Sequence, residues 1–275
     1  MKFKIVVDSS SNLLNSYIKD KEVGFEVVPL IININGKEFV DDDNIDTEAM
    51  LAEFHSTKEK ATTSCPSPGR FMQAYEEADN IICVTITSHL SGTFNSAVLA
   101  GKDLAGKNVH VIDSMSVAGT MQLIVDKAYE LIKEGYEYAQ LVEALNKYRD
   151  SLNLLYVLDS FENLVRNGRM NKAVALIAKT LRIKPLCIAE NGQIKIQQKI
   201  RTYDAAIKRM NMVMKDLCDI SKLTRAILTY VDDKIKAVEI KELIEKTYPN
   251  IKVLVSKAKG LTSFYALENG IMLGF

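Results

Sequence analysis

The chain has 275 residues, of which 47% are hydrophobic and 25% are charged, as in an ordinary globular protein. Its 35 Lys and Arg residues balance its 35 Asp and Glu residues, so no net field favours nucleic acid as a partner. No apolar run reaches membrane-spanning length, and the N-terminal MKFKIVVDSS lacks the apolar core of a signal peptide. We therefore expect a cytoplasmic protein that binds no nucleic acid and does not insert stably into membranes.

The pattern of potential metal ligands argues against a metal site. The four cysteines are widely spaced without a CxxC pair, and the chain has three histidines, which is a poor match to zinc binding. Cys83, Cys187 and Cys218 lie in apolar segments, which is typical of reduced, buried thiols. The acidic run at residues 41–43 lacks the spacing of a calcium loop, and we predict solvated acidic surface there. The sequence thus predicts no metal and no cofactor.

The first 151 residues alternate predicted strands with predicted helices, which is typical of a doubly wound parallel sheet. The strand Lys2–Val7 comes first, and the polar turn Asp8–Asn12 leads from it into a short helix from Leu13. The further elements predicted here are the strand Phe25–Asn33, the hairpin turn Asn35-Gly36 into residues 38–40, the helix Asp46–Phe54, a helix from near Gly69, the strand Ile81–Thr87, a helix from Phe94 through Leu104, the strand Val109–Ile112, and the helices Val117–Lys133 and Tyr138–Ser151.

Three polar turns follow three of these strands, at Asp8–Ser11, Ser88–Thr93 and Asp113–Ser116. In a parallel sheet the carboxyl ends of the strands meet at one edge, where ligands bind. We therefore expect the three turns to lie together at a binding site.

The turn before the helix at Phe94 has the composition of an anion site. A helix N-terminus offers free backbone N–H groups and a positive dipole end. Ser91 and Thr93 add hydroxyl donors, and Gly92 lets a ligand approach the backbone closely. The same residues are also typical of a helix cap without a ligand, so both interpretations stay open on these residues alone.

A second unusual segment, residues 61–69, contains Thr62, Thr63 and Ser64 ahead of two prolines. Proline stiffens and extends the backbone, and small polar side chains on such a loop suit ligand contact. A plain loop that caps the next helix would look similar.

A domain boundary is predicted near residues 152–160, which gives one domain at residues 1–155 and a second at 156–275. Beyond the boundary we expect a smaller mixed sheet with helices, so the fold class is α/β with two domains. The elements predicted there are the strand Leu154–Leu158, a helix capped by Asp159-Ser160 and running to Val165, the turn Asn167-Gly168-Arg169, the helix Lys172–Leu181, hairpin strands Ile183–Ile188 and Ile194–Ile200 around Asn191-Gly192, the helix Asp204–Leu217, the strand Ala226–Val231, the helix Ile235–Lys246, the strand Ile251–Val255 and a final apolar tail.

Seven short motifs span the whole chain. In order, they are Asp8-Ser9-Ser10, Thr63-Ser64-x-Pro66-Ser67, Leu90-Ser91-Gly92-Thr93, Asp113-Ser114, Asn167-Gly168-Arg169-Met170, Ile183-Lys184-Pro185 and Arg201-Thr202. This set resembles the DegV family of bacterial fatty-acid-binding proteins. The resemblance implies two α/β domains with a long-chain fatty acid buried between them, and a lipid carrier rather than an enzyme. Some members present the acyl carboxylate to a fatty acid kinase and retain the acyl phosphate, so such a kinase is an implied partner.

The resemblance also implies roles for individual residues. Ser91 resembles the serine that hydrogen-bonds the carboxylate and Thr63 its threonine partner, while Gly92 and Thr93 would offer backbone N–H groups. The residues expected in the wall of the site are Ser9, Ser10, Ser64, Ser114 and Tyr265. Arg169 and Arg201 match exposed family arginines, with Arg201 as the expected contact to a kinase; ordinary surface charge is the alternative for both.

Two positions depart from the family pattern. Cys65 stands where the family usually has Gln. Tyr265 falls about where a histidine of a His-x-Gly-Pro-Gly-like motif is expected, and a neutral tyrosine can donate to a carboxylate but supplies no cation near pH 7. The change leaves fatty acid binding intact and argues against efficient phosphoryl transfer on the bound acid.

Two other functions compete with the carrier. An acyltransferase or hydrolase could use Ser91 as nucleophile with His89 as base, although no GxSxG elbow is present. A module that only binds other proteins would have a purely structural cavity. The chain shows no heptad repeat or exposed apolar stripe, so we expect a monomer.

Overall fold

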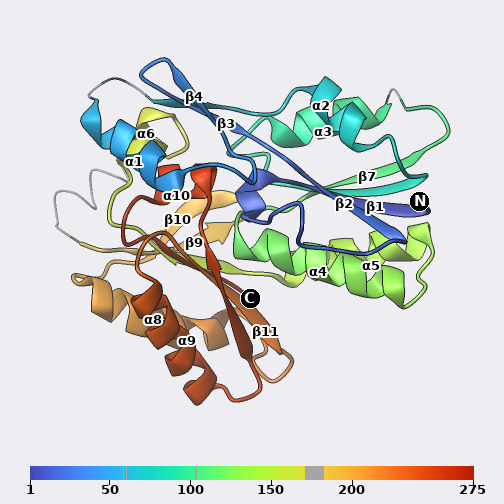
Figure 1. Cartoon of the computed structure of the whole chain (residues 1–275). Helices are drawn as coiled ribbons and strands as arrows, with labels where there is room; N and C mark the ends of the chain where they lie inside the picture. Colours follow the sequence, from blue (N-terminus) through green and yellow to red (C-terminus); the bar gives the residue numbers. More distant parts are fainter. Residues whose placement is uncertain (58, 60, 103, 171–182) are drawn as a thin grey trace.

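The computed structural model describes residues 1–57, 59, 61–102, 104–170 and 183–275. Its described part contains a parallel sheet, a mixed sheet and a small antiparallel sheet, with helices packed around them (Figure 1). None of the helices in these ranges is long and apolar enough to cross a membrane. The predicted helix Lys172–Leu181 lies outside the described residues.

The N-terminal sheet is parallel throughout, as predicted. Its strand order is β2-β1-β6-β7. The strands are β1 (Phe3–Asp8), β2 (Val23–Val28), β6 (Asn80–Thr85) and β7 (Asn108–Asp113). Helices α2 (Pro68–Ala74) and α3 (Thr93–Lys102) cover one face, and α4 (Gly119–Lys133) with α5 (Tyr138–Ser151) covers the other (Figure 1). Helices on both faces make this the expected doubly wound arrangement.

The second sheet is mixed, with the strand order β10-β9-β8-β13-β11-β12. Its strands are β8 (Leu154–Val157), β9 (Leu186–Glu190), β10 (Gln193–Gln198), β11 (Arg225–Tyr230), β12 (Lys252–Lys257) and β13 (Ile271–Gly274). Only β11 and β12 pair in parallel. Helices α8 (Tyr203–Leu217) and α9 (Lys234–Thr247) bury their apolar sides against one face.

The expectation that the second sheet is the smaller one was wrong. Within the described residues it has six strands against four in the parallel sheet. The apolar tail, which the sequence left without an element, forms α10 (Gly260–Ala266) and β13, and β13 enters the sheet between β8 and β11. The strands that pair with β13, β8 and β11, are distant from it in the sequence, so the local sequence pattern does not show that this segment joins the sheet.

Thr63 lies on an edge strand of a small antiparallel sheet with the order β4-β3-β5. It consists of β3 (Ile31–Ile34), β4 (Lys37–Val40) and β5 (Thr62–Ser64), and the hairpin at Asn35-Gly36 joins β3 to β4 as predicted. Thr63 lies opposite Ile32 in the β3–β5 register. Around this sheet lie helices α1 (Thr47–Ser56), α6 (Glu162–Arg166) and α10 (Figure 1).

Two N-terminal predictions were wrong for identifiable reasons. The predicted strand Phe25–Asn33 is broken at Pro29, and its halves join different sheets as β2 and β3. The helix expected from Leu13 does not form. The 3₁₀ turn η1 (Ser9–Ser11) ends at Asn12, which adopts a left-handed φ of 63°, and the Asn12 side chain accepts a hydrogen bond from the Lys259 amide (2.8 Å).

Asp41 was expected on a solvated acidic surface, and this was wrong. Its side chain is buried and accepts hydrogen bonds from the amides of Gly260 (2.9 Å) and Leu261 (3.0 Å), so it holds the start of α10. A Cβ at Gly260 would lie 2.8 Å from the Asp41 carboxylate, which shows how closely the two segments approach. Burial raises the pKa of this carboxyl.

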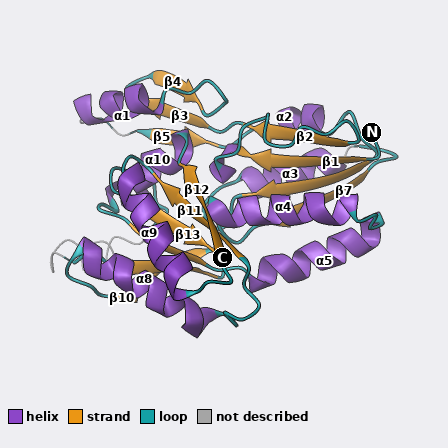
Figure 2. Ribbon diagram, turned by 60° about the horizontal axis from the view of Figure 1, so that its bottom comes forward, coloured by secondary structure: helices purple, strands orange, loops and turns teal. Residues whose placement is uncertain are grey.

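Helix α4 packs against both large sheets. It packs on β1 and β6 of the parallel sheet and on β11 and β13 of the mixed sheet, and Figure 2 shows it reaching from one to the other. Gly119 at its start lies so close to β11 that a Cβ would meet the Ile227 carbonyl oxygen at 2.8 Å. One continuous apolar cluster therefore runs from the parallel sheet to the inner face of the mixed sheet.

Candidate functional site

The three polar turns lie together at the carboxyl edge of the parallel sheet, as predicted. The Ile86 amide donates to Asp8 Oδ2 (2.6 Å), and the Ser88 amide donates to Asp113 Oδ1 (3.1 Å). The Thr87 amide donates to the Ser116 carbonyl oxygen (3.0 Å). Each turn is thus held by the side chain or backbone of a neighbouring one.

Asp8 is the buried centre of this arrangement. It has no solvent exposure, and besides the Ile86 amide it accepts the amide of Ser10 (3.0 Å) and the Ser10 hydroxyl. Burial raises the pKa of its carboxyl to about 6, against the lowering effect of these hydrogen bonds. Asp8 therefore fixes the backbone at the edge of the site without reaching the ligand side.

A pocket lies between this edge and the inner face of the mixed sheet. It has about 820 Å³ of empty space, counting the solvent at its open mouth. Apolar side chains from the mixed sheet, from α10 and from the segments that follow β2 and β6 form most of its wall. They include Leu30, Ile86, Leu154, Leu158, Ile194, Leu261 and Met272.

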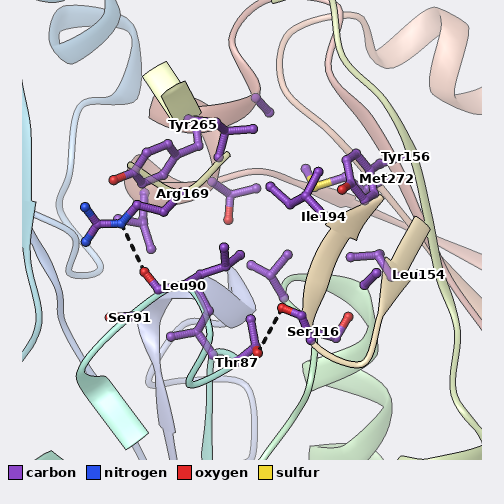
Figure 3. A pocket seen from close by; sticks show the side chains of 18 of the residues that line it. Thr87, Leu90, Ser91, Ser116, Leu154, Tyr156, Arg169, Ile194, Tyr265 and Met272 are labelled. Atoms are coloured by element: carbon purple, nitrogen blue, oxygen red, sulfur yellow. Dashed lines mark hydrogen bonds between the residues drawn. The ribbon is translucent and has the colours of Figure 1, made fainter. Parts of the chain in front are cut away.

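Several polar side chains of the lining gather at one end of the pocket, where Figure 3 shows Ser91, Arg169 and Tyr265 near one another. Thr63 also lines this end, and its Oγ1 lies 2.8 Å from the Tyr265 hydroxyl. Ser91 Oγ lies 2.8 Å from Thr93 Oγ1 and accepts a hydrogen bond from the Thr93 amide (3.3 Å). The structure therefore brings together Thr63, Ser91 and Tyr265 from three distant parts of the sequence.

Helix α3 begins beside Ser91. Its first backbone bond runs from the Ser96 amide to the Gly92 carbonyl oxygen (3.0 Å), so the amides before Ser96 have no acceptor within the helix. Gly92 and Thr93 occupy this first turn but do not themselves line the pocket. The positive end of the helix dipole lies at the polar end of the pocket.

Arg169 was expected to be exposed, and this was wrong. The side chain is half-buried, lines the polar end of the pocket and donates from Nε to the Leu90 carbonyl oxygen (3.0 Å). The turn at Asn167-Gly168 directs it inward, toward the loop that carries Ser91. Arg201, in contrast, is exposed, as expected.

Most of the residues expected in the wall of the site do not line the pocket. Ser9 Oγ accepts the Leu30 amide (3.1 Å), Ser10 bonds Asp8, and Ser114 Oγ donates to the Ser116 carbonyl oxygen (2.9 Å). Hydroxyls in turns readily form hydrogen bonds with nearby groups of the chain, and these three do so instead of facing the pocket. Ser64 is also outside the lining, whereas Tyr265 lies within it.

Three hydroxyl residues that line the pocket, Thr87, Tyr156 and Thr262, were not predicted from the sequence, and neither was the apolar wall. Ser116, which also lines the pocket, belongs to the turn Asp113–Ser116 that was expected at the site. Leu154, Tyr156 and Leu158 line the pocket because alternate residues of β8 and its extension face the same side. A strand buried on both faces shows no polar alternation, so its sequence does not say which side faces a cavity.

The geometry does not support His89 as a base for Ser91. The nearest polar partner of His89 Nδ1 among the described side chains is Gln193 Nε2, at 3.3 Å, whereas Ser91 Oγ pairs with Thr93. In the described ranges no cluster of three or more His, Cys, Asp or Glu side chains could hold a metal ion. Cys83 and Cys187 are buried, as predicted, and burial raises the pKa of each thiol to about 12.

A family model described as "Uncharacterised protein, DegV family" matches residues 2–271. The chain belongs to the DegV family. A DegV domain-containing protein of Streptococcus pyogenes serotype M1 is 35% identical over 281 residues, which cover 100% of this chain and 99% of that protein. The resemblance predicted from the seven motifs is therefore confirmed.

Solved structures of the same family resemble this one closely. The fatty acid kinase B3 protein of Streptococcus pneumoniae, loaded with linoleic acid, is 32% identical with a TM-score of 0.93, over 100% of this chain and 99% of that one. A DegV family protein of Eubacterium eligens loaded with heptadecanoic acid is 30% identical with a TM-score of 0.88, over 99% and 98%. A DegV family protein of Ruminococcus gnavus, refined with vaccenic acid, is 28% identical with a TM-score of 0.90, over 100% and 99%.

Proposed function

We propose that this DegV family protein is a carrier that binds one long-chain fatty acid non-covalently. The observation that carries the proposal is the distribution of polar groups in the pocket: Thr63, Ser91, Arg169 and Tyr265 gather at one end, beside a helix N-terminus, and the wall beyond is mostly apolar. A fatty acid has the same distribution, with one anionic end and a long hydrocarbon chain. Linoleic, heptadecanoic and vaccenic acid in three related structures support this choice of ligand.

The carboxylate is held, in this proposal, by the hydroxyls of Ser91 and Thr63, and the positive end of α3 at Gly92 and Thr93 lies beside it and stabilises its charge. Hydrogen bonds to a charged acceptor contribute about 1.5–3 kcal/mol each. Burial of the chain contributes about 0.8 kcal/mol per methylene. The hydrocarbon therefore supplies most of the affinity, and the hydroxyls supply its orientation.

The acyl chain lies between the two domains that we propose, residues 1–155 and 156–275. Leu30, Ile86 and Val117 contribute from the first, and Leu158, Ile194 and Met272 from the second. The pocket wall therefore needs both halves of the chain, and separating them would expose the hydrocarbon to water.

We further propose a fatty acid kinase as the partner that receives the bound acid. The B3 protein of Streptococcus pneumoniae belongs by name to such a kinase. Arg201 is exposed and is available for this contact. Burial raises the pKa of Tyr265, so the tyrosine stays neutral and supplies no positive charge to a phosphoryl transfer beside the carboxylate.

The proposal is tested by calorimetric titration of the delipidated protein with palmitate and oleate. Wild type should bind one equivalent, and Ser91→Ala should weaken binding about tenfold or more. Ser88→Ala is the matched control, because Ser88 is an exposed hydroxyl in the same loop and does not line the pocket. Absence of binding by the folded wild type would contradict the carrier, and covalent labelling of Ser91 by a fluorophosphonate would favour the hydrolase instead.

A further inference from the structure

Two residues of the pocket wall, Ser116 and Tyr156, carry buried hydroxyls that have no hydrogen-bond partner among the described residues. The two residues are 7% and 5% exposed, so bulk water does not satisfy either group. Buried side-chain hydroxyls in native proteins are nearly always paired, because an unpaired one has lost its water without compensation. A pair of them in one apolar cavity therefore points to a ligand group.

Ser116 is presented to the pocket by a loop that other bonds already fix. The Ser116 amide donates to Ser114 Oγ (3.2 Å), and its carbonyl oxygen accepts from that hydroxyl (2.9 Å) and from the Thr87 amide (3.0 Å). The Met115 amide donates to Asp113 Oδ1 (3.1 Å). These backbone groups are thus in use, and the Ser116 hydroxyl remains unpaired among the described residues.

Tyr156 occupies the middle of the mixed sheet, where Phe would fill the same space without a polar atom. It lies on β8 between Cys187 of β9 and Met272 of β13. Its pocket-side neighbours Leu154 and Met272 are apolar. Burial raises the pKa of the phenol, so the hydroxyl is neutral and can both donate and accept.

These two hydroxyls lie away from the carboxylate end. Figure 3 shows Tyr156 and Ser116 on one side of the pocket, and Arg169, Ser91 and Tyr265 on the other. A carboxylate held at Ser91 does not serve both groups, and a plain alkyl chain offers neither of them a partner. A ligand can pair with these groups only if its chain itself carries an oxygen or another polar atom.

We propose that the preferred ligand is a fatty acid that carries a hydroxyl or oxo oxygen along its chain, and that Tyr156 and Ser116 bind this oxygen. The proposal rests on the fatty acid carrier function and adds the substrate class. A chain hydroxyl can accept a hydrogen bond from one of the two side chains and donate one to the other. Tyr156 and Ser116 then determine specificity, while Ser91 and Thr63 hold the carboxylate.

The test compares the affinities of octadecanoic acid and of octadecanoic acids with one hydroxyl at successive mid-chain positions. The ratio of the two dissociation constants is measured by calorimetry for wild type, Tyr156→Phe and Ser116→Ala. Because the ratio is compared between proteins, the greater water solubility of the hydroxylated acids cancels. Tyr136→Phe is the matched control, since Tyr136 is exposed and does not line the pocket.

For the best positional isomer, Tyr156→Phe should lower the preference for the hydroxylated acid about three- to tenfold, and Ser116→Ala should lower it in the same direction. Both variants should still bind octadecanoic acid, which also reports that they are folded. If every isomer gives the same ratio in wild type and in both variants, the proposal is wrong and the carrier function stands. If wild type binds no fatty acid at all, the carrier function itself fails.

Discussion

Thr63 and Tyr265 are 202 positions apart in the sequence, and their hydroxyl oxygens lie 2.8 Å apart at the polar end of the pocket. The contact joins β5 to α10. Burial raises the pKa of Tyr265, so its hydroxyl keeps its proton at neutral pH and can donate it to Thr63. Thr63 is then free to donate its own proton to a carboxylate, and the tyrosine acts on the ligand through the threonine.

The hydroxyl pair of Thr63 and Tyr265 should contribute to fatty acid affinity. Tyr265→Phe should lower fatty acid affinity about two- to tenfold, and Thr63→Val should lower it at least as much, because each removes one hydrogen bond of the chain. The double variant should lose less than the two single losses combined, since both changes interrupt the same chain. Calorimetric titration with palmitate measures all four proteins. Fully additive losses would show that the two hydroxyls act independently.

Asp8 should make the free energy of unfolding depend on pH. Its pKa is raised from 3.8 to about 6 in the folded protein, so folding favours the protonated form. Stability from this group is therefore full below pH 4 and is lost as the pH rises through 6, by about 3 kcal/mol in all. Urea unfolding of wild type and Asp8→Asn at a series of pH values measures the effect.

For Asp8, the informative quantity is the slope of the free energy of unfolding against pH, and not the free energy of unfolding at any one pH. Asn at position 8 removes an acceptor of the Ile86 or Ser10 amide, so the variant is less stable at every pH. The difference between wild type and variant should shrink as the pH rises from 4 to 7. A constant difference over that range would mean that Asp8 does not titrate there.

The tip of the β9–β10 hairpin should tolerate only glycine at position 192. Gly192 has a φ of 77°, a Cβ there would lie 2.7 Å from the His89 ring, and its carbonyl oxygen accepts the Thr87 hydroxyl (3.1 Å). Gly192→Ala should therefore destabilise the protein by about 2–3 kcal/mol and loosen the cover of the pocket. Urea unfolding and palmitate titration measure the two effects.

Gly36 provides the control for that substitution. It follows an Asn with positive φ in a hairpin of the same kind, has a φ of 76°, and a Cβ added there would meet no other atom within 4 Å. Gly36→Ala should cost only the backbone strain, about 1–2 kcal/mol, and leave palmitate affinity unchanged. Equal effects of the two changes on stability and binding would show that the contact of Gly192 with the loop at Thr87 is unimportant.

Arg201→Ala should separate ligand binding from partner binding. Arg201 is exposed and does not line the pocket, so palmitate affinity should stay unchanged, whereas affinity for a fatty acid kinase should fall. Surface plasmon resonance against the kinase measures the second quantity, with Lys208→Ala on α8 as a control of equal charge. If Arg201→Ala and Lys208→Ala bind the kinase equally well, the contact lies elsewhere.

The sequence was enough to predict those parts of the fold in which the apolar residues of each helix or strand repeat with the period of that element. The strand at Ile81, the helix after Thr93 and the two helices between Val117 and Ser151 were predicted correctly, because apolar spacing of two or 3.6 residues indicates which face is buried. The gathering of the turns at Asp8, Ser88 and Asp113 then followed from the parallel order. Thr63 and Ser91 were singled out by composition, and the structure places both in the pocket.

What the sequence did not reveal depends on distant contacts. The acidic run around Asp41 is typical of a solvated surface. Asp41 is buried at the start of α10 because the amide of Gly260, which is distant in sequence, donates a hydrogen bond to it. Ser9, Ser10 and Ser114 resemble ligand donors, but nearby groups use their hydroxyls. The sequence did not predict that Tyr156 lines the pocket, because the surroundings of Tyr156 depend on the strands that pair with β8 on either side.

The most direct measurement is mass spectrometry of lipid released from the purified, denatured protein, with Ser91→Ala beside wild type. We expect about one equivalent of a long-chain fatty acid from the wild type and clearly less from the variant, because the carboxylate has lost a donor. Ser88→Ala should match wild type. If folded wild-type protein releases no fatty acid, or if Ser91→Ala retains as much as wild type, the account of the carboxylate site is wrong.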